Sequence, residues 1–155
     1  MVTSTTGPRR LTVPVKVRWS DIDGYGHVNN AAMFTLLEEA RIATFWHGAE
    51  GATNVLQAGH GGATHTYIAR QEIEYLAPID YRAEPLQVEL WLSRIGGASL
   101  DVCYEIPVGG EVAVRAMTTV VTVNPDTGRP RRITPEERAA WEPLVGEPVQ
   151  FRRGR

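Results

Sequence analysis

The chain has 155 residues, of which 43% are hydrophobic and 22% are charged, with 16 basic side chains against 18 acidic ones. This size and composition are typical of one globular domain and exclude a largely disordered chain. The near-neutral charge argues against a broad nucleic-acid-binding surface, which needs an excess of Lys and Arg.

The cysteine count and the hydropathy pattern narrow the class of protein further. Cys103 is the only cysteine, so no intrachain disulfide and no CxxC zinc or redox motif can form. The chain contains no run of about 18 apolar residues, and its polar first ten residues show no signal peptide. We therefore expect a cytoplasmic protein that does not enter a membrane.

The first predicted elements are a short strand over Val15–Trp19 and a long helix. A polar, glycine-rich segment over 20–26 separates them. Asn29 and Asn30 then precede the run 31–47, in which eleven of seventeen residues are apolar. Because Asn is a preferred helix N-cap, this run is predicted to be a helix that begins at the two amides. Its broad apolar surface predicts that other elements largely enclose it.

The rest of the chain is predicted to be a sheet followed by a short helix. A glycine-rich stretch over 48–64 is interpreted as a long loop, and beyond it the hydrophobic period changes to two. The alternation predicts four strands joined by tight turns, the first of them half-buried, at about 67–77, 86–92, 100–106 and 112–123. Thr134 to Glu137 has the form of a capping box, which predicts a helix over about 135–142. The segments before Leu11 and after Val149 are expected to be loose tails.

This order of elements predicts an α+β fold, because tight turns make antiparallel neighbours and leave no room for βαβ crossovers. The chemistry is concentrated in the segment 18–30, just before the long helix. It holds the carboxylates of Asp21 and Asp23, the imidazole of His27 and the amides of Asn29 and Asn30. A helix N-terminus beside a carboxylate can polarise a carbonyl and attack it, or activate water to do so. From the residues alone, simple turn and cap roles have equal weight.

The run Asp21-x-Asp23-x-x-Gly26-His27-Val28-Asn29-Asn30, with Glu39-Ala40-Arg41 downstream, resembles the acyl-CoA thioesterases of the hotdog fold. Within them it is most similar to the 4-hydroxybenzoyl-CoA thioesterase-like branch. The resemblance implies a single hotdog domain over 1–155, in which a curved antiparallel sheet wraps a central helix. The hotdog core would span about 12–125, and the helix at 135–142 would be a terminal addition.

The resemblance also implies an activity, the hydrolysis of the thioester between an acyl group and coenzyme A. The catalytic carboxylate then falls on Asp23, acting as nucleophile or general base, and the amide that polarises the carbonyl falls on the backbone N–H of Asn30. Asp21 is expected to shape the turn and Asn29 to cap the helix, with a contact to the substrate as a lesser role of Asn29. His27 either orients Asp23 or a water molecule, or only hydrogen-bonds to the backbone. No metal and no cofactor are expected, apart from coenzyme A as part of the substrate and product.

Further residues are expected to bind the substrate. Glu39 resembles a helix carboxylate of the same branch and is a reserve catalytic candidate, with a surface ion pair as the alternative. Arg94 and Arg131 or Arg132 are candidates for the phosphates of coenzyme A, because guanidinium groups bind phosphate well. Ser99 follows a turn that resembles the coenzyme A contact region of the family.

The family resemblance implies a homodimer or homotetramer with a site shared between subunits. The charge balance and the hydropathy pattern predict no nucleic-acid or membrane partner. The loop over 48–64 and the side chains of Tyr67 and Tyr75 are expected to line the acyl pocket. Three other functions stay open at this point. They are a thioesterase acting on acyl-carrier protein, a non-catalytic acyl-CoA-binding protein, and a hydratase of related fold.

Overall fold

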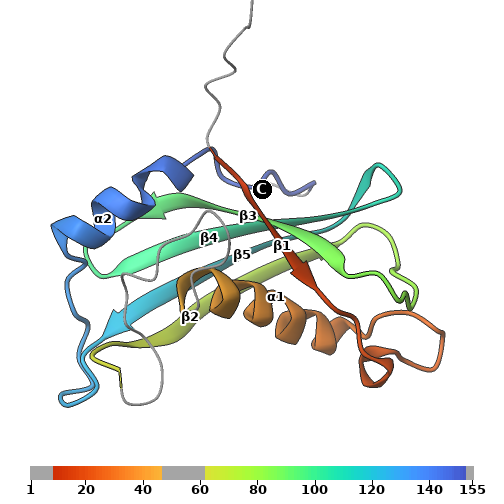
Figure 1. Ribbon diagram of the computed structural model, residues 1–155, viewed down its shortest axis with the longest axis horizontal. Coiled ribbons are helices and arrows are strands. Elements are labelled where there is room, and N and C mark those ends of the chain that lie inside the picture. Colours follow the sequence, from red (N-terminus) through yellow and green to blue (C-terminus); the bar gives the residue numbers. More distant parts are fainter. Residues whose placement is uncertain (1–8, 47–61, 153–155) are drawn as a thin grey trace, which may run out of the picture.

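The computed structural model describes residues 9–46 and 62–152 (Figure 1). Most of the predicted loop over 48–64 and the chain ends at 1–8 and 153–155 lie outside the described residues. Two short 3₁₀ turns, η1 (Trp19–Asp21) and η2 (Glu142–Leu144), accompany the main elements. In chain order these are β1 (Leu11–Val15), α1 (Asn30–Phe45), β2 (His65–Tyr75), β3 (Leu86–Ile95), β4 (Ser99–Val108), β5 (Glu111–Val123) and α2 (Pro135–Trp141).

The five strands form one sheet in the order β1-β3-β4-β5-β2, and every neighbouring pair is antiparallel. Gly109 and Gly110 both have positive φ angles, which a tight hairpin turn between β4 and β5 requires. The sheet curves behind α1, and α2 lies at one end of it (Figure 1). This arrangement confirms the predicted α+β class and the hotdog architecture.

The first strand lies earlier than predicted. Leu11, Val13 and Val15 are buried in β1, whereas Trp19, at the end of the predicted strand, is 75% exposed in η1. The alternation at 11–15 is interrupted by Pro14, which argues against a central strand. The strand tolerates Pro14 because β1 lies at the edge of the sheet and pairs only with β3.

Strand β2 is the other edge of the sheet, and the prediction that it is half-buried was wrong. None of its eleven residues is buried. A bulge at Ala69, between the pairs Ile68–Val120 and Arg70–Thr119, also breaks the alternation of faces along the strand. As a result, Thr66 and Ile68 contribute to one cavity beside α1 and Tyr75 to another, while Tyr67 lines neither.

Helix α1 packs on the concave side of the sheet, and its N-terminus is capped by Asn29 as predicted. Seven of its sixteen residues are buried, and Thr35, Glu38 and Glu39 are exposed. The helix is therefore enclosed on one side rather than on nearly all sides. The buried side anchors the helix firmly, so the position of its first turn is fixed relative to the sheet.

The C-terminal segment is packed against the sheet instead of forming a loose tail after Val149. Val149 is buried in a small cluster with Trp91 and Cys103, and Phe151 packs against that cluster. The indole N–H of Trp91 donates a hydrogen bond of 2.8 Å to the carbonyl of Glu147. Within the described ranges, no helix is long and apolar enough to cross a membrane.

Candidate active site

The loop before α1 is closed by Asp21. Its carboxylate accepts hydrogen bonds from the backbone N–H of Arg18 at 2.8 Å and from the Arg18 guanidinium at 2.9 Å. The Asp21 carbonyl accepts from the N–H of Asn29 at 2.7 Å, so the loop returns to the start of the helix. The hydrogen bond from Arg18 holds the pKa of Asp21 below its usual value. Asp21 is 1% exposed and therefore shapes the loop without facing a ligand.

Asp23 is oriented by the backbone of the same loop. Its Oδ1 atom accepts hydrogen bonds from the N–H groups of Tyr25 at 2.8 Å and His27 at 3.2 Å. Gly26 has a φ of +80°, a conformation that side chains rarely adopt and that lets the loop turn back. No residue in the ranges 9–46 and 62–152 donates to Oδ2, so this oxygen can contact water or a carbonyl carbon.

The start of α1 presents a backbone donor. Asn29 Oδ1 accepts from the N–H groups of Ala31 at 2.8 Å and Ala32 at 3.2 Å. The N–H of Asn30 has no acceptor among the residues that the structure describes. Tyr75 donates a 2.7 Å hydrogen bond to the carbonyl of Asn30, and partial burial raises the pKa of that tyrosine. The first turn of the helix is thus held from both sides while one N–H is left for a ligand.

Asp23, His27 and Asn30 line one cavity of about 350 Å³, together with Tyr75. Its other walls are mainly apolar and come from the start of α1, the segment after β2 and one residue of β5, among them Val28, Met33, Leu76, Pro78, Ile79 and Val114. The three residues predicted to be catalytic therefore meet at one cavity. A carboxylate and a free N–H at a helix N-terminus are the groups needed to attack a carbonyl and to stabilise its oxyanion.

His27 is held by residues that follow β2. Its Nε2 lies 3.5 Å from Asp80 Oδ1, and the two residues also form an isolated antiparallel bridge. The next N–H, that of Val28, donates to the carbonyl of Ile79 at 2.7 Å. Sequence reasoning missed Asp80, because no local pattern links residues 53 positions apart.

Glu39 does not line the Asp23 cavity. It contributes to a separate hollow with Lys16 and Arg18 on the side of α1 near β1. The charge of Glu39 also raises the pKa of Arg18, although hydrogen bonding to Asp21 is the larger cause. The structure therefore places Glu39 away from the other candidate catalytic groups.

Arg94 and Ser99 come together at the turn between β3 and β4. The N–H of Gly96 donates to the Ser99 carbonyl at 2.8 Å. A Cβ atom on Gly96 would lie 2.9 Å from Ser99 Oγ and 3.2 Å from Arg94 Nη2, so both side chains cover this glycine. Neither residue lines the Asp23 cavity.

Arg131 is engaged inside the protein. It donates to both carboxylate oxygens of Glu137, at 2.9 and 2.8 Å, and to Thr64 Oγ1 at 3.0 Å. Burial raises the pKa of Glu137, but hydrogen bonds from Arg131 and from the backbone of Thr134 outweigh it and leave the pKa below its usual value. Thr134 and Glu137 form the predicted capping box, and Arg132 is exposed. The Arg131–Glu137 ion pair thus ties α2 to the end of the sheet.

Within 9–46 and 62–152, no group of three or more His, Cys, Asp or Glu side chains is placed to hold a metal ion. The burial of Cys103 raises the pKa of its thiol, which disfavours the reactive thiolate.

Comparisons with known proteins agree with this geometry. A family model described as the thioesterase-like superfamily matches residues 17–141. Uncharacterized protein YsmA of Bacillus subtilis is 29% identical over 125 residues, covering 80% of both chains. A predicted thioesterase from Bacillus stearothermophilus is 27% identical with a TM-score of 0.74, covering 91% of this chain and 100% of that one. A thioesterase from Thermus thermophilus, complexed with coenzyme A and Zn, is 29% identical with a TM-score of 0.68, covering 93% and 99%.

Proposed function

Because the chain belongs to the thioesterase-like superfamily, we propose that it hydrolyses acyl-CoA thioesters to a free acid and coenzyme A. The observation that carries the proposal is the cavity lined by both Asp23 and Asn30, since within 9–46 and 62–152 no residue donates to Oδ2 of Asp23 and none accepts from the N–H of Asn30. A thioester carbonyl oriented toward that N–H presents its carbon to the Asp23 carboxylate. The coenzyme A complex of the Thermus thermophilus relative supports coenzyme A as the leaving group.

The residues of the cavity supply what thioester hydrolysis requires. Asp23 either attacks the carbonyl carbon and forms an anhydride that water then hydrolyses, or takes a proton from the water that attacks. In both routes negative charge develops on the carbonyl oxygen, where the Asn30 N–H and the helix dipole stabilise it. The C–S bond then breaks, and the thiolate leaves without a strong acid, since a thiol has a pKa of about 8.5.

The Asn29 cap and the hydrogen bond from Tyr75 hold the N–H of Asn30 in position. The Asn29 side chain satisfies the N–H groups of Ala31 and Ala32, so the Asn30 N–H is the one left in the first turn for the carbonyl oxygen. The hydrogen bond from Tyr75 to the Asn30 carbonyl fixes the peptide on its other side. A donor held in place before the reaction costs no reorganisation in the transition state.

The phosphates of coenzyme A are assigned to Arg94 and Ser99. The two side chains converge at Gly96, on the turn between β3 and β4. Arg131 is the weaker candidate, because its guanidinium is held by Glu137. Arg132 is exposed and free of that ion pair, so it fits a surface phosphate better.

We also propose that the protein assembles as a homodimer or homotetramer. Among the residues that the structure describes, strand β2 pairs only with β5, so its other edge presents backbone groups without a partner there, beside the exposed side chains of Tyr67 and Ile68. Such an edge favours pairing with another copy. Sedimentation velocity tests the assembly, and a purely monomeric species at micromolar concentration would contradict it.

The function is tested by thiol release from a panel of aromatic, short, medium and long acyl-CoAs, with the same acyl groups on acyl-carrier protein in parallel. The proposal expects faster release from coenzyme A. Faster release from the carrier would reassign the substrate to acyl-carrier protein. Binding of every acyl-CoA without any thiol release would show a non-catalytic binding protein.

A further inference from the structure

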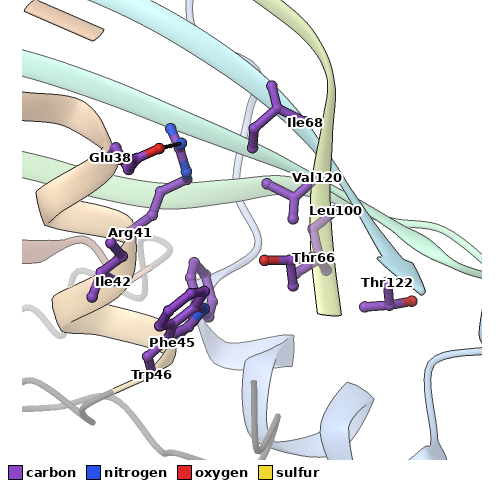
Figure 2. Close-up of a pocket in the computed structure, with 10 residues that line it drawn as sticks. All are labelled: Glu38, Arg41, Ile42, Phe45, Trp46, Thr66, Ile68, Leu100, Val120 and Thr122. Carbon is purple, nitrogen blue, oxygen red and sulfur yellow. Dashed lines mark ion pairs between the residues drawn. The ribbon is translucent and has the colours of Figure 1, made fainter. Parts of the chain in front are cut away.

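A second cavity, of about 220 Å³, lies between α1 and the sheet (Figure 2). Most of its walls are apolar and come from the second half of α1 and the facing strands, namely Ile42, Phe45, Trp46, Ile68, Leu100 and Val120. Charged Arg41 also lines it and is only 8% exposed. A buried charge in apolar surroundings is costly unless it meets an anion or enough acceptors.

The described residues satisfy few of the donors of Arg41. A guanidinium has five N–H groups. Nη1 donates to the hydroxyl of buried Tyr104 at 3.2 Å, and Nη2 lies 3.8 Å from Glu38 Oε2, beyond hydrogen-bond distance. Among the described residues, two side-chain nitrogens are sealed from solvent and have no hydrogen-bond partner. They belong to Arg82 and Trp141, and none belongs to Arg41. Within this part of the chain, the remaining nitrogens of Arg41 are therefore not sealed from solvent, and we take the cavity that Arg41 lines as the route by which a ligand reaches them.

The contact with Glu38 is loose enough to be exchanged. Glu38 is one helical turn from Arg41, and its side chain is 56% exposed. Figure 2 shows both side chains projecting from α1 toward the strands, with the apolar side chains of Ile68 and Val120 beyond them. A carboxylate that entered the cavity could accept hydrogen bonds from the Arg41 guanidinium with both of its oxygens. The exposed side chain of Glu38 would then turn into solvent. A bidentate pair of that kind is shorter and stronger than the present contact.

The cavity that Arg41 lines and the cavity of Asp23 share the walls of α1 and β2. Asn30 and Met33 of α1 line the Asp23 cavity, whereas Arg41 and Phe45 of the same helix line the second cavity. Strand β2 contributes to both in the same way, through Tyr75 and Thr66 respectively. At 1.5 Å per residue, the eleven residues from Asn30 to Arg41 span about 16 Å along the helix. The two cavities therefore follow one another along α1 and β2.

We propose that Arg41 binds a carboxylate at the far end of the acyl group, so that the preferred substrates are ω-carboxyacyl thioesters, the monothioesters of dicarboxylic acids. This substrate class rests on the proposed thioesterase function. The thioester lies at Asp23 and Asn30, the apolar chain follows α1 and β2, and the terminal carboxylate pairs with the Arg41 guanidinium. An acyl group that ends in methyl leaves this buried cation with only its loose 3.8 Å contact to Glu38.

The test compares kcat/KM for two acyl-CoAs of equal chain length, one ending in carboxylate and the other in methyl. Wild type is expected to favour the carboxylate at least tenfold. Arg41→Met should abolish that preference by slowing the carboxylate substrate alone, and Arg129→Met, which removes an exposed turn arginine, should keep it. Glu38→Gln removes the competing carboxylate and should raise the preference severalfold. This exposed variant gives the answer if Arg41→Met does not fold.

Two results would overturn the inference. One is a wild type that hydrolyses the methyl-ended substrate at least as well as the carboxylate-ended one. The other is a folded Arg41→Met variant, or a Glu38→Gln variant, with the wild-type preference. If no acyl-CoA is hydrolysed, the proposed function fails instead. Calorimetric affinities of the same two acyl-CoAs for wild type and the variants then decide the role of Arg41.

Discussion

Replacing Arg131 by methionine is expected to destabilise the protein strongly and to leave catalysis unchanged. The substitution removes both hydrogen bonds to Glu137, whose side chain is almost fully buried, and leaves that carboxylate without its cation. Breaking a buried ion pair in this way costs about 3–5 kcal/mol. Because the Arg131 side chain is 22% exposed, water compensates part of the loss, and we expect a value of about 3 kcal/mol.

Thermal unfolding measures this cost directly. For a chain of this size, about 1 kcal/mol corresponds to roughly 2–4 °C in Tm, so the variant should melt about 6–12 °C below wild type. The double variant Arg131→Met with Glu137→Met removes both charges and should recover much of the loss.

The pKa of Glu137 is lowered in the folded protein, so the stability from the pair is present above the unfolded pKa of about 4.3 and is lost as pH falls through the folded pKa. The difference between wild type and the single variant should therefore shrink in acid.

The same experiment separates two roles of Arg131. If it ties α2 to the sheet, KM for acyl-CoA stays within about twofold of wild type at a temperature where the variant is folded. An unchanged Tm together with a tenfold rise in KM would refute the reasoning. It would show instead that Arg131 binds the phosphates of coenzyme A.

Two further predictions concern the loop and the helix start. Asn29→Ala removes the cap on the N–H groups of Ala31 and Ala32. It should lower the free energy of unfolding, measured in urea, by about 1 kcal/mol, and it should also lower kcat. A variant with wild-type stability would contradict the capping role. Asp21→Asn should destabilise the protein at neutral pH. Because Arg18 lowers the pKa of Asp21, its contribution is present above about pH 4 and is lost as pH falls through the folded pKa. Stability of the variant should thus fall less steeply in acid than that of wild type, and equal slopes in pH-dependent urea unfolding would contradict this.

The parts of the fold that local chemistry determines could be predicted from the sequence. The Asn29 cap, the hairpin at Gly109 and Gly110, and the capping box from Thr134 to Glu137 are each specified by neighbouring residues. The meeting of Asp23 with the helix start was also predictable. Both lie within one short loop, and glycine at position 26 lets that loop turn back.

The parts that depend on distant neighbours could not be predicted. Pro14 fits a strand only because β1 lies at the sheet edge, which the local pattern does not show. The bulge at Ala69 arises from pairing with β5, and it reversed the expected faces of the part of β2 before it, whereas Tyr75 beyond the bulge lines a cavity as expected. Arg41 belongs to the Glu39-Ala40-Arg41 run that resembles the family, but the sequence predicted no role for it, because its hydrogen bond to Tyr104 joins residues 63 positions apart.

The role of Asp23 is tested most directly by thiol release from acyl-CoA under saturating substrate, with wild type and Asp23→Asn side by side. The asparagine keeps an oxygen that can accept from the N–H groups of Tyr25 and His27, so the fold of the loop should survive. It can neither attack the carbonyl nor take a proton from water, and we expect kcat to fall by about 10²–10⁴-fold. A folded Asp23→Asn protein that turned over acyl-CoA at the wild-type rate would contradict the assignment.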